Sequence, residues 1–201
     1  MADDISAKSL RLFVAISLPD HVRHAITAAQ EELRALVSPN AIRWTNPDQF
    51  HLTLKFLGDV PAGQEGALRA ALQPICAAAY ALFLCAQGVG FFPHERSPRV
   101  IWAGINESTG SLADLQKRIE AAVQPFAPRQ GTEKFSGHVT LGRVKFLKRP
   151  EAGKLAGYAR SLNQRQFGEW TAKEVELIQS ELAPSGARHS VLAAFPLGHR
   201  R

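Results

Sequence analysis

Two short stretches of this chain read almost alike: Phe50-His51-Leu52-Thr53-Leu54-Lys55-Phe56-Leu57-Gly58 and Gly137-His138-Val139-Thr140-Leu141-Gly142-Arg143-Val144. Each contains the pattern His-x-Thr-Leu inside an apolar run. Successive side chains of a β-strand point to opposite faces, so each histidine shares a face with its threonine while the apolar residues between them face a core. The sequence therefore predicts two similar strands, each presenting one imidazole and one hydroxyl.

The spacing of the two stretches indicates an internal repeat. His51 and His138 are 87 residues apart (138 − 51), and the same offset lays the apolar run 12–18 on the run 99–105. Both copies read strand, helix, His-x-Thr strand. Such a repeat predicts an α+β, bilobal fold of two β-sheet and helix lobes related by a pseudo-twofold axis, with both motifs in a central cleft.

Length and composition favour one globular domain. The chain has 201 residues, of which 45% are hydrophobic, and this is enough to bury a substantial core. We expect a loose tail over residues 1–9 and a single bilobal domain over residues 10–201, acting as a monomer. A formal charge of +6 and a pI of about 9.7 favour an anionic partner such as a nucleic acid or a phosphate ester, although a merely basic surface would explain the charge as well.

The cysteines and the N-terminus predict a cytoplasmic protein. Only Cys76 and Cys85 occur, and the first residues lack the basic and apolar regions of a signal peptide. The most apolar run, 75–86, is shorter than the roughly 20 residues that cross a bilayer as a helix. We therefore expect a reduced, cytoplasmic location and no membrane segment.

Alternation, helical periodicity and turn residues predict the other elements. Strands are expected at 10–18, 42–45, 81–87, 99–105 and 167–171, followed by a hairpin of strands 175–182 and 188–195. Helices are expected from Asp20 to near Ser38, over 64–80 with a bend or restart at Pro74, over 111–126 and over 150–162. The segment 88–98, rich in Gly and Pro, is expected to be a loop.

Two histidines at matched positions can divide acid and base work. The unperturbed histidine pKa of about 6.5 lets one imidazole be neutral while its neighbour is protonated near neutral pH. An in-line displacement at phosphorus needs such a pair. Thr53 and Thr140 would donate hydroxyl hydrogen bonds to the non-bridging phosphate oxygens, and Arg143 would add a permanent charge.

Arg143 raises a geometric difficulty. In a regular strand its odd spacing from His138 would point it to the opposite face. A β-bulge at Gly142 would re-aim the arginine toward the cleft. The alternative is a solvated charge at the end of the strand.

A metal site is the competing use of the histidines. Metal sites normally include further His, Cys or carboxylate ligands, and neither motif contains an acid. His94 and Glu95 could be recruited only from a loop, and the sequence has neither a P-loop nor a Gly-x-Ser-x-Gly elbow. We therefore expect chemistry without a metal or a cofactor. The remaining histidines are interpreted as surface or structural residues: His21, His24, His189 and His199.

The motifs and their context resemble the two-histidine phosphoesterase superfamily, in which Arg43-Trp44 would precede the first motif and Arg143 would close the second. More narrowly, the chain resembles the bacterial RNA 2′,3′-cyclic phosphodiesterases, once called 2′-5′ RNA ligases. The stretches that carry this likeness are Arg11-Leu12-Phe13-Val14-Ala15-Ile16, Pro98-Arg99-Val100-Ile101-Trp102-Ala103-Gly104 and Ser180-Glu181-Leu182-Ala183-Pro184-Ser185-Gly186. It covers residues 10–196 with no major departure from the pattern.

The resemblance implies metal-independent hydrolysis of a terminal RNA 2′,3′-cyclic phosphate to a 2′-phosphate. It implies that His51 is the proton donor to the departing O3′ and His138 the proton acceptor from water. Thr53, Thr140 and Arg143 would hold the phosphate. Because the ring opening is formally reversible, the reverse 2′-5′ ligation is expected as well.

Phe13 or Trp44 is predicted to stack on a base, since stacking tolerates any sequence. Two other functions stay open at this point. One is a non-catalytic binder of RNA ends; the other is a phosphodiesterase for a small cyclic nucleotide or an ADP-ribose cyclic phosphate. Turnover of a cyclic-phosphate oligonucleotide separates enzyme from binder, and kcat/KM for mononucleotide against RNA separates the two enzymes.

Overall fold

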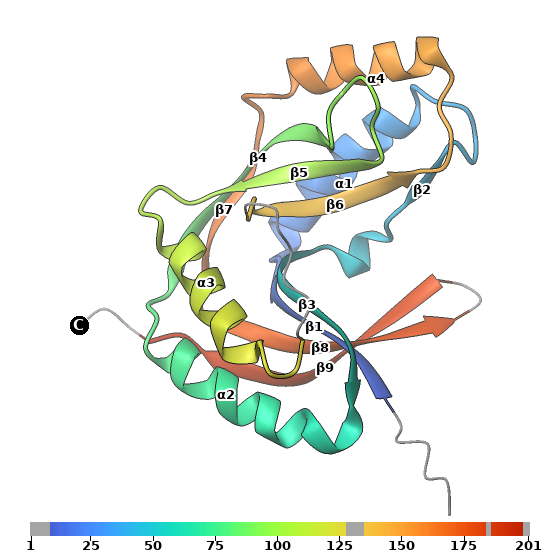
Figure 1. The fold of residues 1–201 in the computed structure, drawn as a ribbon. Coiled ribbons are helices and arrows are strands. Elements are labelled where there is room, and N and C mark those ends of the chain that lie inside the picture. The colour runs from blue at the N-terminus through green and yellow to red at the C-terminus, as the bar shows by residue number, and fades with distance from the viewer. Residues whose placement is uncertain (1–8, 128–134, 184–185, 199–201) are drawn as a thin grey trace, which may run out of the picture.

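The protein contains two antiparallel β-sheets. The structure is a computed structural model, which describes residues 9–127, 135–183 and 186–198. Within these residues, sheet A has four strands in the order β3-β1-β8-β9, and sheet B has five in the order β2-β6-β5-β4-β7 (Figure 1). The strands of sheet A are β1 (Ser9–Ser17), β3 (His51–Pro61), β8 (Glu174–Ala183) and β9 (Gly186–Pro196). Those of sheet B are β2 (Ile42–Trp44), β4 (Leu82–Phe92), β5 (Val100–Asn106), β6 (His138–Val144) and β7 (Gln166–Ala172).

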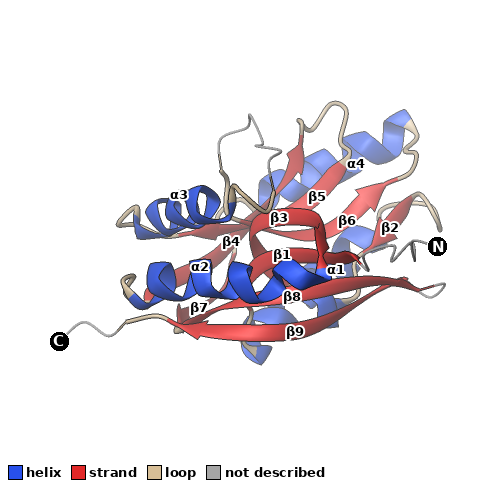
Figure 2. Ribbon diagram, turned by 60° about the horizontal axis from the view of Figure 1, so that its bottom comes forward, coloured by secondary structure: helices blue, strands red, loops and turns tan. Residues whose placement is uncertain are grey.

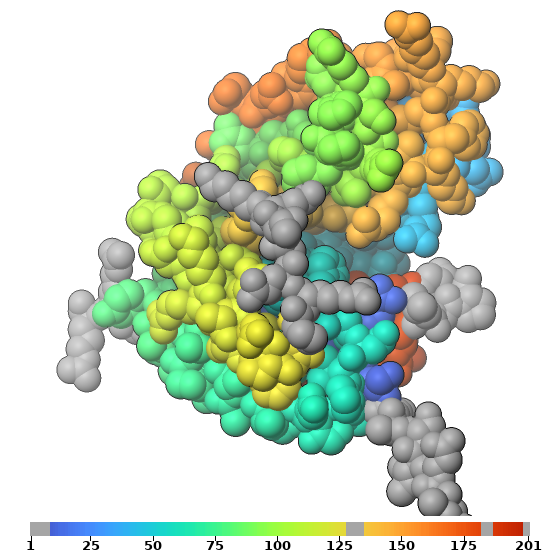
Figure 3. Space-filling model, viewed as in Figure 1, coloured from blue at the N-terminus to red at the C-terminus, as the bar shows by residue number. Residues whose placement is uncertain are grey.

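Helices cover the outer face of each sheet (Figure 2). They are α1 (Asp20–Arg34), α2 (Glu65–Ala77), α3 (Ser111–Val123) and α4 (Arg149–Ser161), with short 3₁₀ turns η1 (Pro47–Gln49) and η2 (Ala62–Gln64). Helices α2 and α3 lie against sheet A, and α1 and α4 against sheet B. The space-filling view shows the same arrangement, with α4 at the top of the molecule and α2 at the bottom (Figure 3).

The two repeats exchange their helices. β1 and β3 of the first repeat lie in sheet A, yet α1, which joins them in sequence, packs on sheet B against β7 and α4. In the second repeat β5 and β6 lie in sheet B, yet α3 packs against β3 of sheet A and against α2. Each His-x-Thr strand is therefore supported from behind by the helix of the other repeat, and each lobe contains elements of both repeats.

Alternation along the strands places the core between each sheet and its helices. Leu12, Val14 and Ile16 of β1 are nearly inaccessible and belong to one apolar cluster that runs through both lobes. Burying a side chain of this size contributes about 1.5–3 kcal/mol relative to leaving it exposed. Phe13 and Ala15 alternate with these residues and form a separate cluster with Ile178 on the opposite face of sheet A. That second face is the one turned toward sheet B.

The predicted α+β, bilobal fold is confirmed, and two predicted boundaries are wrong. β4 continues to Phe92 rather than ending at residue 87, because the chain passes Gly88 with a positive φ of 73° and then pairs again with β5. The predicted loop 88–98 thus shrinks to the residues between β4 and β5. α2 runs through Pro74 without restarting, since Ala78 N donates to Pro74 O at 3.1 Å, and it ends at Ala77.

None of the helices in the described residues is both long and apolar enough to cross a membrane.

Candidate functional site

The two His-x-Thr strands approach each other between the sheets. His51 is the first residue of β3 and His138 the first residue of β6, and both side chains are half-buried. A positive charge on His138 lowers the pKa of His51, so the two imidazoles are close enough to interact electrostatically. The structure thus brings together the two histidines that the repeat predicts to share one site.

Both imidazoles are held in the same way by the backbone. His51 Nδ1 lies 2.7 Å from the carbonyl oxygen of Gln49, and His138 Nδ1 lies 2.8 Å from that of Ser136. A carbonyl oxygen can only accept, so Nδ1 carries the hydrogen in each ring. In the neutral imidazole the lone pair is then on Nε2, which is the nitrogen left to exchange a proton with a ligand.

Aromatic rings surround both histidines. Phe13 stacks on His51 with ring centroids 4.7 Å apart, and Phe92 meets His138 edge-on at 4.9 Å. Trp102 lies beyond, with its centroid 6.4 Å from that of His138. These apolar walls remove water from the rings, which disfavours the charged imidazolium.

Burial lowers the pKa of His51 from its ordinary value of 6.5 to about 4, against the raising effect of the bond to Gln49 and with the further help of His189 and His138. Burial also lowers the pKa of His138, and the positive charge of Arg143 adds to this effect. Both imidazoles are therefore neutral at pH 7 in the protein without ligand.

The threonines occupy the expected side of each strand. Thr53 and Thr140 are half-buried, as are the histidines two residues before them, whereas Leu52 and Val139 between them are fully buried. The alternation predicted from the sequence therefore holds through both motifs up to the threonine.

A β-bulge turns Arg143 toward His138. Opposite β5, Ile101 pairs with Gly142 but the next residue, Trp102, pairs with Thr140, so Leu141 is the extra residue. The alternation then shifts by one, and Arg143 lies on the face of His138 rather than on the opposite one. Its influence on the pKa of His138 agrees with this placement. The predicted bulge exists, although its extra residue is Leu141 and not Gly142.

The two aromatic residues predicted to stack on a base differ in their surroundings. Phe13 is 2% exposed and is covered by the rings of His51, Phe56 and His189. Trp44 is half-buried, opposite Gly142 in the β2–β6 ladder, with the guanidinium of Arg34 5.6 Å from its ring. Because α1 covers that face of sheet B, Trp44 points away from the cleft. Base stacking by Phe13 or Trp44 stays a prediction, and it would require one of these rings to become accessible.

His189 of β9 was interpreted from the sequence as a surface or structural residue, yet it lies in the site. Its ring is edge-on to His51, with centroids 5.4 Å apart, and edge-on to Phe13 at 5.0 Å. Nothing in the local sequence around residue 189 signals this position. It arises because β9 joins the same sheet as β3 through β8 and β1, over long sequence distances.

A cavity of about 240 Å³ opens beside the second motif. It lies next to Ser136 and Gly137, immediately before His138, and Trp102 forms part of its wall. Its polar side chains are uncharged, and Asn106 donates to Gln87 at 3.2 Å within it. Its side chains therefore offer neutral hydrogen-bond donors and acceptors and no charge.

The metal alternative involved His94 and Glu95. Glu95 is engaged instead by Arg160 of α4, whose guanidinium lies 3.0 Å from it. Across the ranges that the structure describes, no group of three or more His, Cys, Asp or Glu side chains could hold a metal ion.

The depressed histidine pKa predicts how stability depends on pH. Between pH 6.5 and about 4 the unfolded chain binds a proton at His51 that the folded chain does not, so the free energy of unfolding falls as the pH falls through this range. The loss is on the order of 3 kcal/mol for the full shift. His51→Gln should flatten this slope, as measured by urea unfolding at pH 7, 6, 5 and 4.5. An unchanged slope in the variant would contradict the assigned burial of His51.

Comparisons with known proteins cover nearly the whole chain. A family model described as LigT like phosphoesterase matches residues 16–102 and again residues 104–189, one match on each repeat. A Thermus thermophilus protein is 34% identical over 196 residues, which is 94% of this chain and 90% of the relative. An Archaeoglobus fulgidus protein is 31% identical over 186 residues, 92% of this chain and 99% of the relative. Both relatives are named RNA 2′,3′-cyclic phosphodiesterase.

Solved structures agree with this assignment of the fold. A crystal structure of a Thermus thermophilus protein superposes with a TM-score of 0.78 at 30% identity, covering 96% of this chain and 100% of the other. The crystal structure of Escherichia coli LigT complexed with 3′-AMP superposes with a TM-score of 0.74 at 25% identity, covering 94% of this chain and 99% of the other.

Proposed function

The chain belongs to the LigT like phosphoesterase family, and from this premise we propose that it hydrolyses the 2′,3′-cyclic phosphate at the 3′ end of RNA to a 2′-phosphate. The observation that carries the proposal is the matched pair of imidazoles. Each donates a hydrogen bond from Nδ1 to a backbone carbonyl, and its Nε2 has no hydrogen-bond partner among the residues that the structure describes; the two lie within electrostatic reach of each other.

In the proposed reaction His138 acts as the base and His51 as the acid. His138 Nε2 takes a proton from water as the water oxygen attacks phosphorus. The P–O3′ bond breaks on the opposite side, and O3′ takes a proton from His51 Nε2, leaving a 3′-hydroxyl and a 2′-phosphate. The lowered pKa of His138 beside Arg143 suits a base that must start neutral.

His51 needs its proton before it can act as an acid, and its pKa of about 4 keeps it neutral in the free protein at pH 7. An anionic phosphate bound between the imidazoles raises the pKa of both, because opposite charge favours the protonated form. We propose that His51 takes up its proton together with the substrate. The alkaline limb of the kcat profile should then lie at higher pH than that of the kcat/KM profile.

Three further residues are proposed to hold the phosphate. The hydroxyls of Thr53 and Thr140 share the faces of the two histidines, and Arg143 is turned to the same side by its bulge. Donors aimed at the non-bridging oxygens stabilise the negative charge that develops there. The same groups would serve 2′-5′ ligation, in which the 5′-hydroxyl of a second RNA end attacks phosphorus in place of water. The P–O3′ bond breaks, O3′ takes the proton, and the two ends are joined through a 2′-5′ linkage.

The test is turnover of a short RNA ending in a 2′,3′-cyclic phosphate, with the product resolved as a 2′- or 3′-phosphate. Binding without turnover would favour an RNA-end binder. A kcat/KM as high for a cyclic mononucleotide as for RNA would favour a small-molecule phosphodiesterase. The neutral cavity beside His138 is consistent with a nucleobase next to the phosphate in either case.

We also propose that the reaction needs no metal ion, since neither motif carries a carboxylate ligand. Activity should survive prolonged incubation with EDTA, measured as kcat on the cyclic-phosphate RNA before and after dialysis. Loss of activity that added divalent ions restore would make the histidines ligands and would overturn the acid and base assignment.

The proposed setting is a monomer in a reducing cytoplasm. Cys76 is buried and Cys85 is half-buried, and both are free thiols. Sedimentation at micromolar protein concentration tests the oligomeric state directly.

A further inference from the structure

Both motifs contain the same β-bulge. In β3, Val14 of the neighbouring strand pairs with Lys55 but Ala15 pairs with Thr53, so Leu54 is the extra residue. In β6 the extra residue is Leu141, which lies 87 positions later (141 − 54), the same offset that relates the histidines. The bulge is therefore part of the repeated unit and not a local accident.

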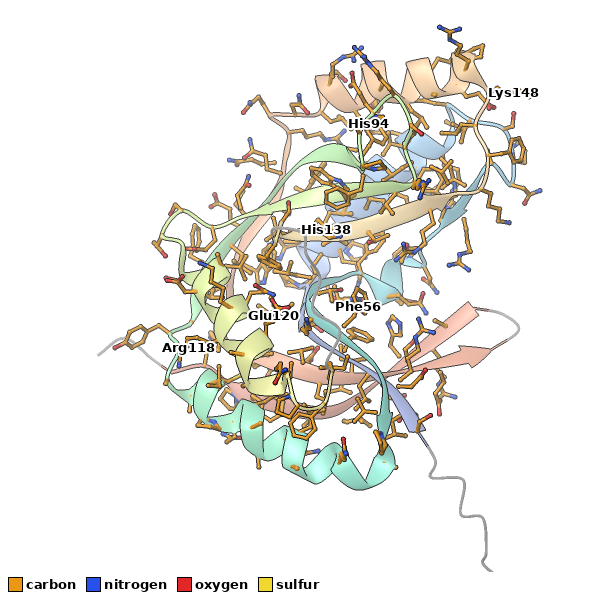
Figure 4. The ribbon with its side chains drawn as sticks, in the orientation of Figure 1. Phe56, His94, Arg118, Glu120, His138 and Lys148 are labelled. Atoms are coloured by element: carbon orange, nitrogen blue, oxygen red, sulfur yellow. The ribbon has the colours of Figure 1, made fainter. Side chains whose placement is uncertain are left out.

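The bulge decides which side chains face the cleft after each threonine. In the first motif, Lys55 turns to the helix side, where it is 9% exposed and its Nζ lies 2.5 Å from Glu120 of α3. Phe56 turns to the cleft side, where it is 63% exposed and 5.9 Å from the ring of Phe13. Figure 4 shows Glu120 and Phe56 on opposite sides of β3.

The second motif follows the same rule. A Cβ added to Gly142 would lie 2.7 Å from Ile42 Cγ2 in the core, so this position faces the helices as Lys55 does. Arg143 corresponds to Phe56 and turns to the side of His138. Without the bulge, Arg143 would point into the core and Gly142 into the cleft.

A buried glutamine from the other repeat braces each bulge. Gln30 of α1 is fully buried, and its Nε2 donates to Leu141 O and to Thr45 O, both at 2.8 Å. Gln116 of α3 is 7% exposed, and its Nε2 donates to Leu54 O at 3.4 Å. The exchanged helices thus deliver one carboxamide to the bulged leucine of each motif, with the tighter contact at the second.

Stability alone does not explain a buried glutamine at position 30. Among the described residues its Oε1 is buried without a hydrogen-bond partner, and a buried acceptor left unpaired costs about 1–3 kcal/mol. Leu141 O also accepts from Thr45 N at 2.9 Å, so this carbonyl would keep one partner if the glutamine were replaced. Gln30 links α1 both to β6 at the bulge and to Thr45, the residue that follows β2.

We propose that Gln30 is a positioning residue: by bracing the Leu141 bulge from the opposite repeat, it holds Arg143 in the cleft where the substrate phosphate binds. Gln116 braces the first motif in the same way but through a longer contact. This inference rests on the proposed function for the identity of the phosphate, but its test is a binding measurement that requires no turnover.

The experiment measures the affinity of inorganic phosphate by calorimetry for the wild type, Gln30→Met, Arg143→Ala and the double variant. Arg143→Ala should weaken binding roughly 10- to 100-fold, the usual contribution of a hydrogen bond to a charged group. Gln30→Met, which keeps the size of the side chain but loses its donors, should lose most of the same factor. The double variant should bind no more weakly than Arg143→Ala, because both changes remove one contact.

Gln116→Met is the matched control, since it removes the equivalent contact from the other motif. Its effect on phosphate affinity should be independent of Arg143→Ala, so the two factors should multiply in the double variant. If Gln30 were merely structural, Gln30→Met would lower Tm, and its effect on phosphate affinity would be absent or would multiply with that of Arg143→Ala. Either result overturns the proposal. If Gln30→Met fails to fold, Gln30→Asn, which draws the same donors back by one methylene, should show the same coupling.

If Arg143→Ala bound inorganic phosphate as tightly as the wild type, Arg143 would not contact the phosphate, and the inference about Gln30 would be wrong. Lack of turnover by the wild type, with the coupling intact, would overturn the proposed function alone.

Discussion

Alanine at His51 or at His138 is expected to lower kcat by ~10²–10⁴, the usual contribution of a positioned general acid or base. The reason is the geometry of the two rings. Each has Nδ1 committed to a backbone carbonyl and Nε2 available to the substrate, so either substitution removes one positioned proton donor or acceptor of the matched pair. Steady-state turnover of a cyclic-phosphate RNA measures the loss.

The double variant distinguishes a joint mechanism from two independent effects. If both imidazoles act on one phosphate, the combined loss should be much smaller than the product of the two single losses, since residues that act as a unit are not additive. His189→Ala is the control. It removes a third imidazole 5.4 Å from His51 that has no place in the repeat, and it should change kcat far less. Near-normal turnover by His51→Ala would contradict the proposed mechanism.

A substrate with sulfur at the 3′ leaving position should restore most of the activity that His51→Ala loses. A thiolate is a much weaker base than an alkoxide, with a thiol pKa near 8.5, so it departs without a proton from an acid. The rescue should recover a large part of the ~10²–10⁴ loss. The same substrate should leave His138→Ala impaired, because activation of the attacking water still needs a base. Single-turnover rates on the paired oxygen and sulfur substrates measure both effects.

The direction of the rescue assigns the two roles. If the sulfur substrate restored the activity of His138→Ala and not that of His51→Ala, His138 would be the acid and His51 the base within the same site. The product gives an independent check on the oxygen substrate. Departure of O3′ leaves a 2′-phosphate, and recovery of a 3′-phosphate would mean that the opposite bond breaks.

Much of this site could be predicted because the signals are local. Alternation within a strand places His51 with Thr53 and His138 with Thr140, and it requires only that the segments be strands with one buried face. The 87-residue offset needs only the sequence itself. The predicted hairpin of β8 and β9 follows in the same way from turn residues between two apolar segments.

Sequence patterns do not reveal features that depend on partners distant in sequence. β4 extends to Phe92 because β5 offers a pairing edge beyond Gly88, which no pattern within 81–98 reveals. Trp44 lies on the helix side because β2 pairs with β6, about a hundred residues later. Phe13 is covered by His51, from a neighbouring strand, and by His189, from the far edge of the sheet.

The sequence by itself determined the two strands, the face of each histidine and threonine, and the repeat that pairs them, because side-chain alternation and spacing are properties of the chain alone. Only the tertiary structure decided the exchange of α1 and α3 between the lobes, the approach of His189 to His51, and the bulge that turns Arg143 into the cleft. These depend on which strands pair and in what register, and register is set by the sum of many long-range contacts. Gln30 shows the difference most clearly, since in sequence it is one polar residue on a helix, and in the fold it braces the motif of the other repeat.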